Sequence, residues 1–255
     1  MPDYDGEVMQ PIYARWQDEP GFTKQRVNKA HATHCGEVTM VDTAIIFSTD
    51  HGFYFGEHGG LFGKMTFAQR PEGGLYRHGD ADSRWEHSPL YEELVRLPLL
   101  IRVPGYDAGS YSGTSSAVDM MPTVLDLFGQ PPPGWVEGLS LLPAMRDRST
   151  SGRDFVVSTI PFANPGSFVR SVDNISRPLA TGLATTVTSG DWSFLFSGDP
   201  GRSELYDLSS DPGQQRNLIG DRPEVARELH RTLVGFMRDT GLPEHLLNPQ
   251  LELKL

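Results

Sequence analysis

TAIIFSTDHGFYFGEHGGLFGK, residues 43–64, is the stretch that decides the fold. It opens with an unbroken apolar run at residues 44–47, and such a run of β-branched and aromatic residues is typical of a strand covered on both faces, as in a parallel sheet. A polar loop follows directly and contains Asp50, His51 and Lys64. Because ligands in open α/β sheets lie beyond the carboxyl ends of the strands, this loop is predicted to carry the chemistry.

The composition indicates a globular protein. The chain has 255 residues, of which 38% are hydrophobic, so it can bury a sizeable core. Its net charge of −11 argues against a nucleic-acid partner, because binding to phosphate backbones needs clustered Lys and Arg. No apolar run approaches the roughly 20 residues of a membrane span, and the N-terminus lacks the regions of a secretory signal. We therefore expect a soluble chain without a membrane partner, and the compartment is not indicated.

Residues 1–150 have the order of elements of an α/β domain. A second apolar run at residues 97–103 predicts a strand, and the prolines that bracket it place it near a sheet edge. The polar, Gly-rich segment at 69–87 is expected to be a loop on the substrate side. Helical spacing or capping residues predict three helices, at 23–40, 89–95 and 120–128.

Capping residues set the expected ends of these helices. Ser88 suits the N-cap of the second helix, and Asp119 suits the N-cap of the third. Gly129 is expected to end the third helix, since glycine readily adopts the left-handed conformation that closes a helix.

Residues 151–255 predict a small α+β subdomain after a seam near residue 150. A turn at residues 189–191 is expected to join the middle two of four antiparallel strands. A long helix should begin at a capping box formed by Asp221 and Glu224 and end at Gly241, covering one face of the sheet. The four strands are predicted at 155–160, 183–188, 192–196 and 204–208.

The polar loop contains residues suited to a cation and an anion. Asp50 and His51 can both reach one cation, and Lys64 can neutralise an oxyanion. From the residues alone, the pair can equally cap a turn, and the lysine can be solvated. Glu57 and His58 lie between glycines, and this arrangement favours a structural role for both.

Four segments, taken in order, resemble the second half of a sulfatase of the alkaline-phosphatase-like superfamily. The resemblance covers roughly residues 23–241 and implies a partial sulfatase sheet with flanking helices. The segments are STDHGFYFGEHGGLFGK, PLYEELVRLPLLIRVPG, AVDMMPTVLDLFGQPPPGWVEGLSLLP and ELYDLSSDPGQQRNL.

The resemblance also implies a function and a site. It matches Asp50 and His51 to calcium ligands, with magnesium possible in place of calcium, and Lys64 to the lysine that contacts the sulfate group. In that family a formylglycine, made within a CxPxR or SxPxR motif, attacks the sulfur while the metal withdraws charge from the sulfate oxygens. The implied substrate is a sulfated small molecule or sugar.

This sequence departs from the family pattern at the nucleophile. It contains no CxPxR or SxPxR motif, and its single cysteine, Cys35, is followed by GEV. The family's first acidic metal-binding segment, active-site arginine and histidine acid also have no counterpart, and Asp42 abuts Thr43 where a connecting helix is expected. We therefore expect negligible turnover by this chain alone. The alternatives are a phosphonate monoester or phosphodiester hydrolase of the same superfamily and a non-catalytic fragment or binding module.

Overall fold

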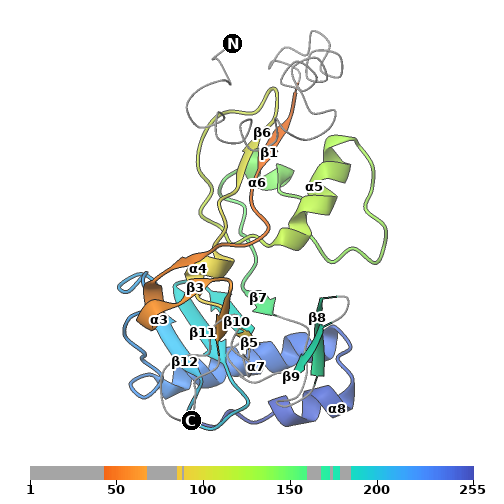
Figure 1. Cartoon of the computed structure of the whole chain (residues 1–255). Coiled ribbons are helices and arrows are strands. Elements are labelled where there is room, and N and C mark those ends of the chain that lie inside the picture. The colour runs from red at the N-terminus through yellow and green to blue at the C-terminus, as the bar shows by residue number, and fades with distance from the viewer. Residues whose placement is uncertain (1–42, 68–84, 88, 160–167, 173–174, 179–184) are drawn as a thin grey trace, which may run out of the picture. The chain divides into compact units, whose positions relative to one another are not determined.

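The computed structural model describes residues 43–67, 85–87, 89–159, 168–172, 175–178 and 185–255 (Figure 1). The helix expected at 23–40, Cys35 and most of the loop at 69–87 lie outside the described residues. The chain divides into two units, Met1–Ile46 with Leu100–Tyr106 and Phe47–Leu99 with Asp107–Leu255. The second unit holds residues from both sides of the seam expected near residue 150, and that domain boundary stays a prediction.

A short sheet contains the strand that opens residues 43–64. Strand β1 (Ile45–Phe47) pairs with β6 (Leu100–Arg102), and the Arg102 guanidinium donates a hydrogen bond of 2.8 Å to the Thr43 carbonyl oxygen. The expectation that β1 is covered on both faces is wrong, because Ile45 is 36% exposed and Phe47 is 59% exposed. Two strands of three residues each form too small a surface to be enclosed, and no third strand joins them within the described part of the chain.

The antiparallel sheet predicted for the C-terminal segment is confirmed. Its order is β12-β11-β10-β7, with every neighbouring pair antiparallel, and Gly190 supplies the turn between β10 and β11 with φ of 55°. A separate hairpin, which the sequence did not predict, pairs β8 (Phe168–Val172) with β9 (Ile175–Pro178). The four strands of the main sheet are β7 (Val156–Thr159), β10 (Thr185–Ser189), β11 (Trp192–Phe196) and β12 (Glu204–Asp207).

Helix α7 (Pro223–Asp239) covers one face of this sheet, as expected (Figure 1). Its apolar residues recur at helical spacing, which gives the helix one face that is stable only when buried. Gly241, with φ of 72°, ends the helix as predicted. The core between helix and sheet contains Val187, Phe194, Phe196, Leu205, Ala226, Leu229, Leu233 and Met237.

The capping box expected at the start of α7 is wrong. The residue before the helix is Arg222, and it makes no side-chain capping hydrogen bond. Asp221 instead accepts a hydrogen bond of 3.0 Å from the Arg216 guanidinium. The proline at position 223 explains the shift, because its fixed φ suits the first helical position and its missing N–H needs no cap.

After α7 the chain turns back along the helix. Helix α8 (Glu244–Leu247) leads into a 3-10 turn, η2 (Asn248–Gln250). The His230 imidazole Nε2 contacts the Gln250 carbonyl oxygen at 2.8 Å, so this buried ring joins the turn to α7.

Helix α5 (Met120–Leu127) confirms the third predicted helix. Gly129, with φ of 64°, follows it, and the Gly129 and Gln130 amides donate hydrogen bonds to carbonyls of the last turn, so the predicted stop is confirmed. Asp119 occupies the N-cap position of α5, as predicted, but its side chain makes no capping hydrogen bond to that helix. Its carboxylate instead accepts hydrogen bonds from the Ser116 amide, the Leu139 amide and Arg153.

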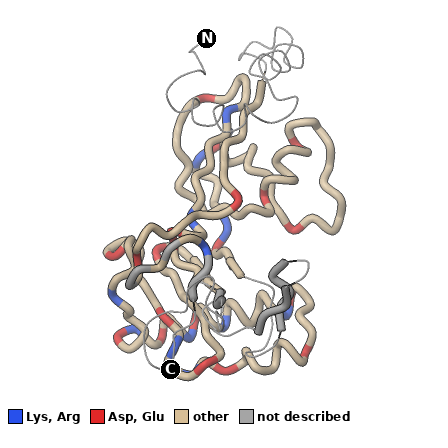
Figure 2. The backbone as a smooth tube through the Cα atoms, in the orientation of Figure 1, with Lys and Arg blue, Asp and Glu red and all other residues tan. Residues whose placement is uncertain are grey.

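The remaining described elements include short helices and a further antiparallel pair of strands, β4 (Met65–Phe67) with β5 (Trp85–His87). The helix expected at 89–95 begins later, as α4 (Glu92–Val95), with Tyr91 at its N-cap in an extended conformation. Ser88, its expected cap, lies outside the described residues. Helix α6 (Leu142–Arg146) follows α5. None of the described helices has the length and apolar character to cross a membrane. Along the described chain, Lys and Arg are interspersed with Asp and Glu (Figure 2).

One face of α5 is apolar and exposed. Met121, Val124 and Phe128 recur at helical spacing and are 43%, 38% and 75% exposed. We expect Phe128→Ser to change the free energy of unfolding by no more than about 0.5 kcal/mol, because the ring is mostly in solvent. The same change should raise the protein concentration at which light scattering detects aggregation, since it removes exposed apolar area.

The exposed residue Gln130 offers a matched control for this prediction. Gln130→Ser should leave both the thermal melt and the aggregation threshold as they are in the wild type. A drop of more than about 1 kcal/mol in the Phe128→Ser protein would show that the ring is buried in solution, contrary to the prediction.

Candidate functional site

The loop that begins after β1 turns back on itself. Strand β2 (Tyr54–Phe55) pairs antiparallel with β3 (Phe62–Gly63), and the short helix α3 (Glu57–Gly60) joins them. Tyr54 is opposite Gly63, so the residues before β2 and after β3 come close together. This hairpin explains how His51 and Lys64, far apart in sequence, can meet.

The structure brings all three predicted site residues together. The Lys64 ammonium Nζ lies 2.9 Å from the His51 Nε2, and that nitrogen lies 3.5 Å from the Asp50 Oδ2. The His51 Nδ1 lies 2.7 Å from the Gly52 carbonyl oxygen. These contacts fit one neutral tautomer, in which Nδ1–H donates to the carbonyl and Nε2 accepts from the ammonium.

Asp50 is the most accessible member of this group. Its side chain is 84% exposed, whereas that of His51 is 37% exposed. The electrostatic effect of the adjacent His51 ring, which is attractive when that ring is protonated, lowers the pKa of the Asp50 carboxyl, and hydrogen bonds from the backbone N–H groups of both residues lower it further. Asp50 is thus an exposed carboxylate with oxygens turned to solvent, next to a lysine ammonium and an imidazole.

These residues do not make a calcium site by themselves. Calcium takes six to eight ligands, mostly oxygen, and magnesium needs six in near-octahedral geometry. Asp50 and His51 supply one carboxylate and one imidazole. No group of three or more His, Cys, Asp or Glu side chains suited to a metal occurs within the described residues. The described residues therefore fit an anion site built on Lys64 better than a complete metal centre.

Gly52 allows the loop to approach α4 closely. The Gly52 amide donates to the Leu94 carbonyl at 2.9 Å, and the Phe53 amide donates to the Glu93 carbonyl at 3.1 Å. A Cβ atom at Gly52 would lie 1.7 Å from the Glu93 carbonyl oxygen, which is a severe steric clash. Any other residue at this position would therefore force the loop away from α4. The sequence reasoning missed this role, although a glycine directly after Asp50 and His51 is a signal of close backbone approach.

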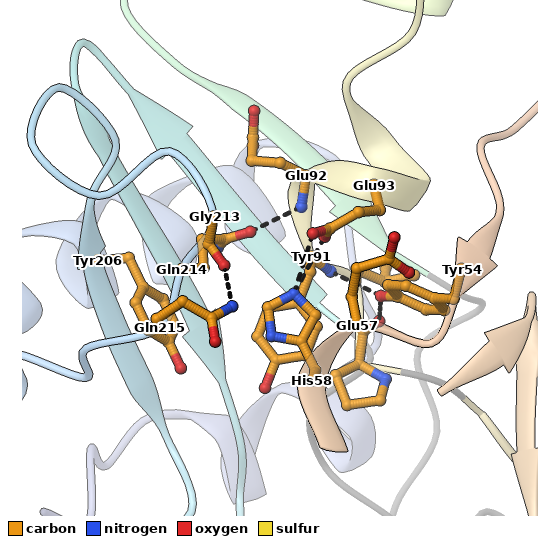
Figure 3. Close-up of polar contacts among 12 residues, drawn as sticks. Tyr54, Glu57, His58, Tyr91, Glu92, Glu93, Tyr206, Gly213, Gln214 and Gln215 are labelled. Atoms are coloured by element: carbon orange, nitrogen blue, oxygen red, sulfur yellow. Dashed lines mark hydrogen bonds and ion pairs between the residues drawn. The ribbon is translucent and has the colours of Figure 1, made fainter. Parts of the chain in front are cut away.

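His58 makes contacts that fit the structural role favoured by the sequence. Its Nε2 lies 3.1 Å from the Glu93 Oε2, and its ring stacks on Tyr91 with centroids 3.7 Å apart and planes 13° apart (Figure 3). The His58 side chain is 7% exposed. Hydrogen bonds from the backbone N–H groups of Glu57 itself and of Phe55 lower the pKa of the Glu57 carboxyl, and the bond from Phe55 closes the local turn.

Tyr91 connects this loop to the C-terminal sheet. Its hydroxyl donates to the Glu204 carboxylate on β12 at 2.7 Å, and the Tyr206 hydroxyl donates to the same carboxylate at 2.8 Å. Burial raises the pKa of both hydroxyls above the ordinary value, so both remain protonated donors at neutral pH. The Tyr54 hydroxyl accepts from the Tyr91 amide and donates to the Pro89 carbonyl.

Gln214 makes a second connection between α4 and the sheet. Its side-chain oxygen accepts from the Glu92 amide at 2.7 Å (Figure 3). Its side-chain NH₂ donates to the Ser193 hydroxyl on β11 at 3.0 Å. Gln214 is 2% exposed. The sequence reasoning missed Gln214, Glu93 and Tyr91, because a side chain that joins distant segments has no local sequence signature.

Comparison with known proteins shows which proteins the chain is similar to. Residues 39–130 match the family model described as Sulfatase. The chain is 28% identical over 202 residues to an N-acetylglucosamine-6-O-sulfatase of Bacteroides thetaiotaomicron, covering 78% of this chain and 30% of that protein. It is 29% identical over 195 residues to arylsulfatase K of Homo sapiens, covering 75% of this chain and 30% of that protein. The chain therefore spans less than a third of the length of these relatives.

Solved structures show the same fold. A phosphonate monoester hydrolase from Silicibacter pomeroyi matches with a TM-score of 0.57 and 22% identity over 84% of this chain and 38% of that one. A Bacteroides thetaiotaomicron structure, described in connection with the metabolism of glycosaminoglycans, matches with a TM-score of 0.57 and 21% identity over 89% of this chain and 44% of that one. The expected resemblance to part of a sulfatase, in sequence and in α/β fold, is confirmed.

Proposed function

We propose that this chain, with its sulfatase segment at residues 39–130, supplies one side of the site of a sulfuric ester hydrolase. The observation that carries the proposal is the contact of 2.9 Å between Lys64 and His51 on an exposed loop, beside the carboxylate of Asp50. No described carboxylate lies within ion-pairing distance of the Lys64 ammonium, and an ammonium group held in this way is suited to a tetrahedral oxyanion.

Lys64 has the substrate-binding role in this proposal. Its ammonium group exchanges the hydrogen bond to His51 Nε2 for one to a sulfate oxygen. There it stabilises the negative charge that grows on the oxygen as the ester bond breaks. His51 stays oriented by its Nδ1 contact with the Gly52 carbonyl, and this leaves the Nε2 lone pair available to a cation once Lys64 contacts the sulfate.

Asp50 and His51 are proposed as the cation ligands from this side of the site. Calcium is the proposed ion, with magnesium as the alternative, and the remaining ligands must come from outside the described residues because two are too few for either ion. A formylglycine nucleophile must also come from elsewhere, since this sequence contains neither motif that forms one. We therefore propose negligible turnover by this chain alone.

The proposed substrate is a sulfated small molecule or sugar. One matched protein is an N-acetylglucosamine-6-O-sulfatase and another is the choline-sulfatase of Rhizobium meliloti. A solved structure with a TM-score of 0.54 and 22% identity is described in complex with its substrate D-glucosamine-2-N,6-O-disulfate. These names favour a sulfate ester on a small polar molecule.

A phosphonate or phosphodiester is the second candidate substrate. The fold likeness to the Silicibacter pomeroyi phosphonate monoester hydrolase favours it, and an ammonium group binds either tetrahedral anion. A non-catalytic binding module remains the alternative from another class, and it would bind neither anion at Lys64.

Titration of the isotope-labelled chain with sodium sulfate tests the proposal. We expect sulfate to shift the NMR signals of His51 and Lys64, and we expect Lys64→Met to weaken sulfate binding about tenfold, because it removes a charge-assisted hydrogen bond. Lys254→Met is the matched control, since Lys254 is an exposed lysine in the C-terminal segment, and it should leave the affinity unchanged.

Two outcomes would count against this reading. Equal sulfate affinity in the wild type and the Lys64→Met protein would remove Lys64 from the site. Tighter binding of methylphosphonate than of sulfate would favour the phosphonate alternative.

A further inference from the structure

We infer that His58, Glu93 and Tyr91 form a positioning clamp that sets the contact between His51 and Lys64. The clamp lies outside the proposed anion site and acts by holding the hairpin that carries that site. Its effect on anion binding rests on the proposed function, whereas its effect on the hairpin does not.

The hairpin is too short to hold its own shape. Strands β2 and β3 contain two residues each, and an isolated two-stranded hairpin is marginal in water even when it is longer. His51 lies before β2 and Lys64 lies after β3, so a small change in strand pairing would separate them. Contacts from outside the hairpin must therefore maintain the distance of 2.9 Å between their nitrogens.

The first external contact is at the turn of the hairpin. His58 lies in α3, which joins the two strands, and its Nε2 lies 3.1 and 3.2 Å from the two carboxylate oxygens of Glu93. The side chains are 7% and 22% exposed, so water competes little for this contact. The contact between His58 and Glu93 therefore holds the turn of the hairpin against α4.

The second external contact orients the His58 ring. Tyr91 stacks under it at 3.7 Å, and the Tyr91 hydroxyl is fixed by Glu204 on β12. Tyr206 packs edge-on against Tyr91 with centroids 6.1 Å apart. The Tyr91 ring, on which His58 stacks, is thus held by two residues of the C-terminal sheet, Glu204 and Tyr206. Figure 3 shows His58, Tyr91 and Tyr206.

The backbone of α4 completes the clamp. The same helix that contributes Glu93 accepts the Gly52 and Phe53 amides through its carbonyls. The start of the hairpin and its turn are therefore attached to one rigid element. Loss of the contact at the turn should loosen the start as well, and with it the orientation of His51.

Three variants test the clamp. His58→Phe keeps an aromatic ring on Tyr91 and loses the bond to Glu93, while Glu93→Gln keeps an acceptor for His58 and serves as the conservative variant. His230→Phe is the matched control, because it removes another hydrogen bond of a buried histidine, at the distant contact with Gln250.

The measurements are amide exchange, the His51 side-chain ¹⁵N shifts and sulfate affinity. For His58→Phe we expect exchange of the Gly52 and Phe53 amides to rise about tenfold, the His51 shifts to change and sulfate affinity to fall about threefold to tenfold. Glu93→Gln should keep most of the wild-type behaviour. His230→Phe should lower the melting temperature without changing the His51 shifts.

The proposal is wrong if His58→Phe leaves the ¹⁵N shifts of His51 and the amide exchange of Gly52 and Phe53 unchanged. It is also wrong if His230→Phe changes these quantities as much as His58→Phe does. If the wild type binds no sulfate, the proposed function fails, and the clamp is still decided by the exchange and the His51 shifts.

Discussion

Asp119→Ala is expected to lower the free energy of unfolding of the segment around α5 by about 3–5 kcal/mol, the usual cost of removing one partner of a buried ion pair. Asp119 is 1% exposed, and its carboxylate accepts from the Arg153 guanidinium and from the Ser116 and Leu139 amides. Removal leaves a partly buried positive charge and two amides without acceptors. Chemical denaturation and amide exchange at Ser116 and Leu139 measure the loss.

Asp126→Ala is the matched control for this variant. Asp126 lies in α5, the helix that Asp119 precedes, is exposed and accepts a hydrogen bond of 2.6 Å from the Ser140 hydroxyl. Its loss should cost about 1 kcal/mol, the usual net value of one hydrogen bond. Equal effects of Asp119→Ala and Asp126→Ala would show that the ion pair contributes nothing beyond a surface contact.

The same carboxylate predicts a dependence of stability on pH. Burial opposes ionisation of Asp119, but hydrogen bonds from Arg153, Leu139 and Ser116 outweigh it and place its pKa below the ordinary 3.8. Because the pKa is lower in the folded state, the stability that Asp119 contributes is present above about pH 4 and is lost as the pH falls through the folded-state pKa. The Asp119→Ala protein should therefore lose less stability than the wild type on acidification.

Gly52→Ala is expected to separate the loop from α4 and to lower the free energy of unfolding of that contact by about 2–4 kcal/mol, from overpacking and the loss of two backbone hydrogen bonds. The added Cβ would lie 1.7 Å from the Glu93 carbonyl oxygen, and a backbone atom cannot move aside as a side chain can. The bonds lost are those from Gly52 and Phe53 to α4. Exchange of these two amides measures the effect directly.

Gly134→Ala controls for the loss of glycine flexibility. Nothing lies within 4 Å of a Cβ atom built at Gly134, so its replacement should change stability by no more than about 0.5 kcal/mol. If the amides of residues 52 and 53 exchange in the Gly52→Ala protein at the wild-type rate, the close approach of Gly52 to the Glu93 carbonyl is contradicted. Retention of sulfate binding in that protein would show that Lys64 does not depend on this contact.

The regular elements could be predicted because their patterns are local. The strand at 192–196, the hairpin turn at Gly190 and the helix that ends at Gly241 all follow from alternation, turn residues and helical spacing. Capping was less predictable. Asp119 and Asp221 have the right residue type for N-caps, but tertiary partners, Arg153 and Arg216, engage their carboxylates instead.

The side chains of the candidate site could be chosen from the sequence, and their role as a site stays a prediction. Asp50, His51 and Lys64 were found from the motif, and the structure brings them together through a hairpin. The supporting residues were not found. Glu93 reaches His58 across 35 positions in the chain, and Tyr91 reaches Glu204 across 113, so neither contact leaves a periodic or adjacent signal in the sequence.

The sequence by itself determined the chemical groups of the loop, the helix and strand patterns and the resemblance to sulfatases, because each depends on residue type and spacing along the chain. Only the tertiary structure decided that α4 and the C-terminal sheet hold that loop, through Gly52, His58 and Tyr91. It also decided that β1 is largely exposed, since burial depends on what packs against a strand and not on the strand alone.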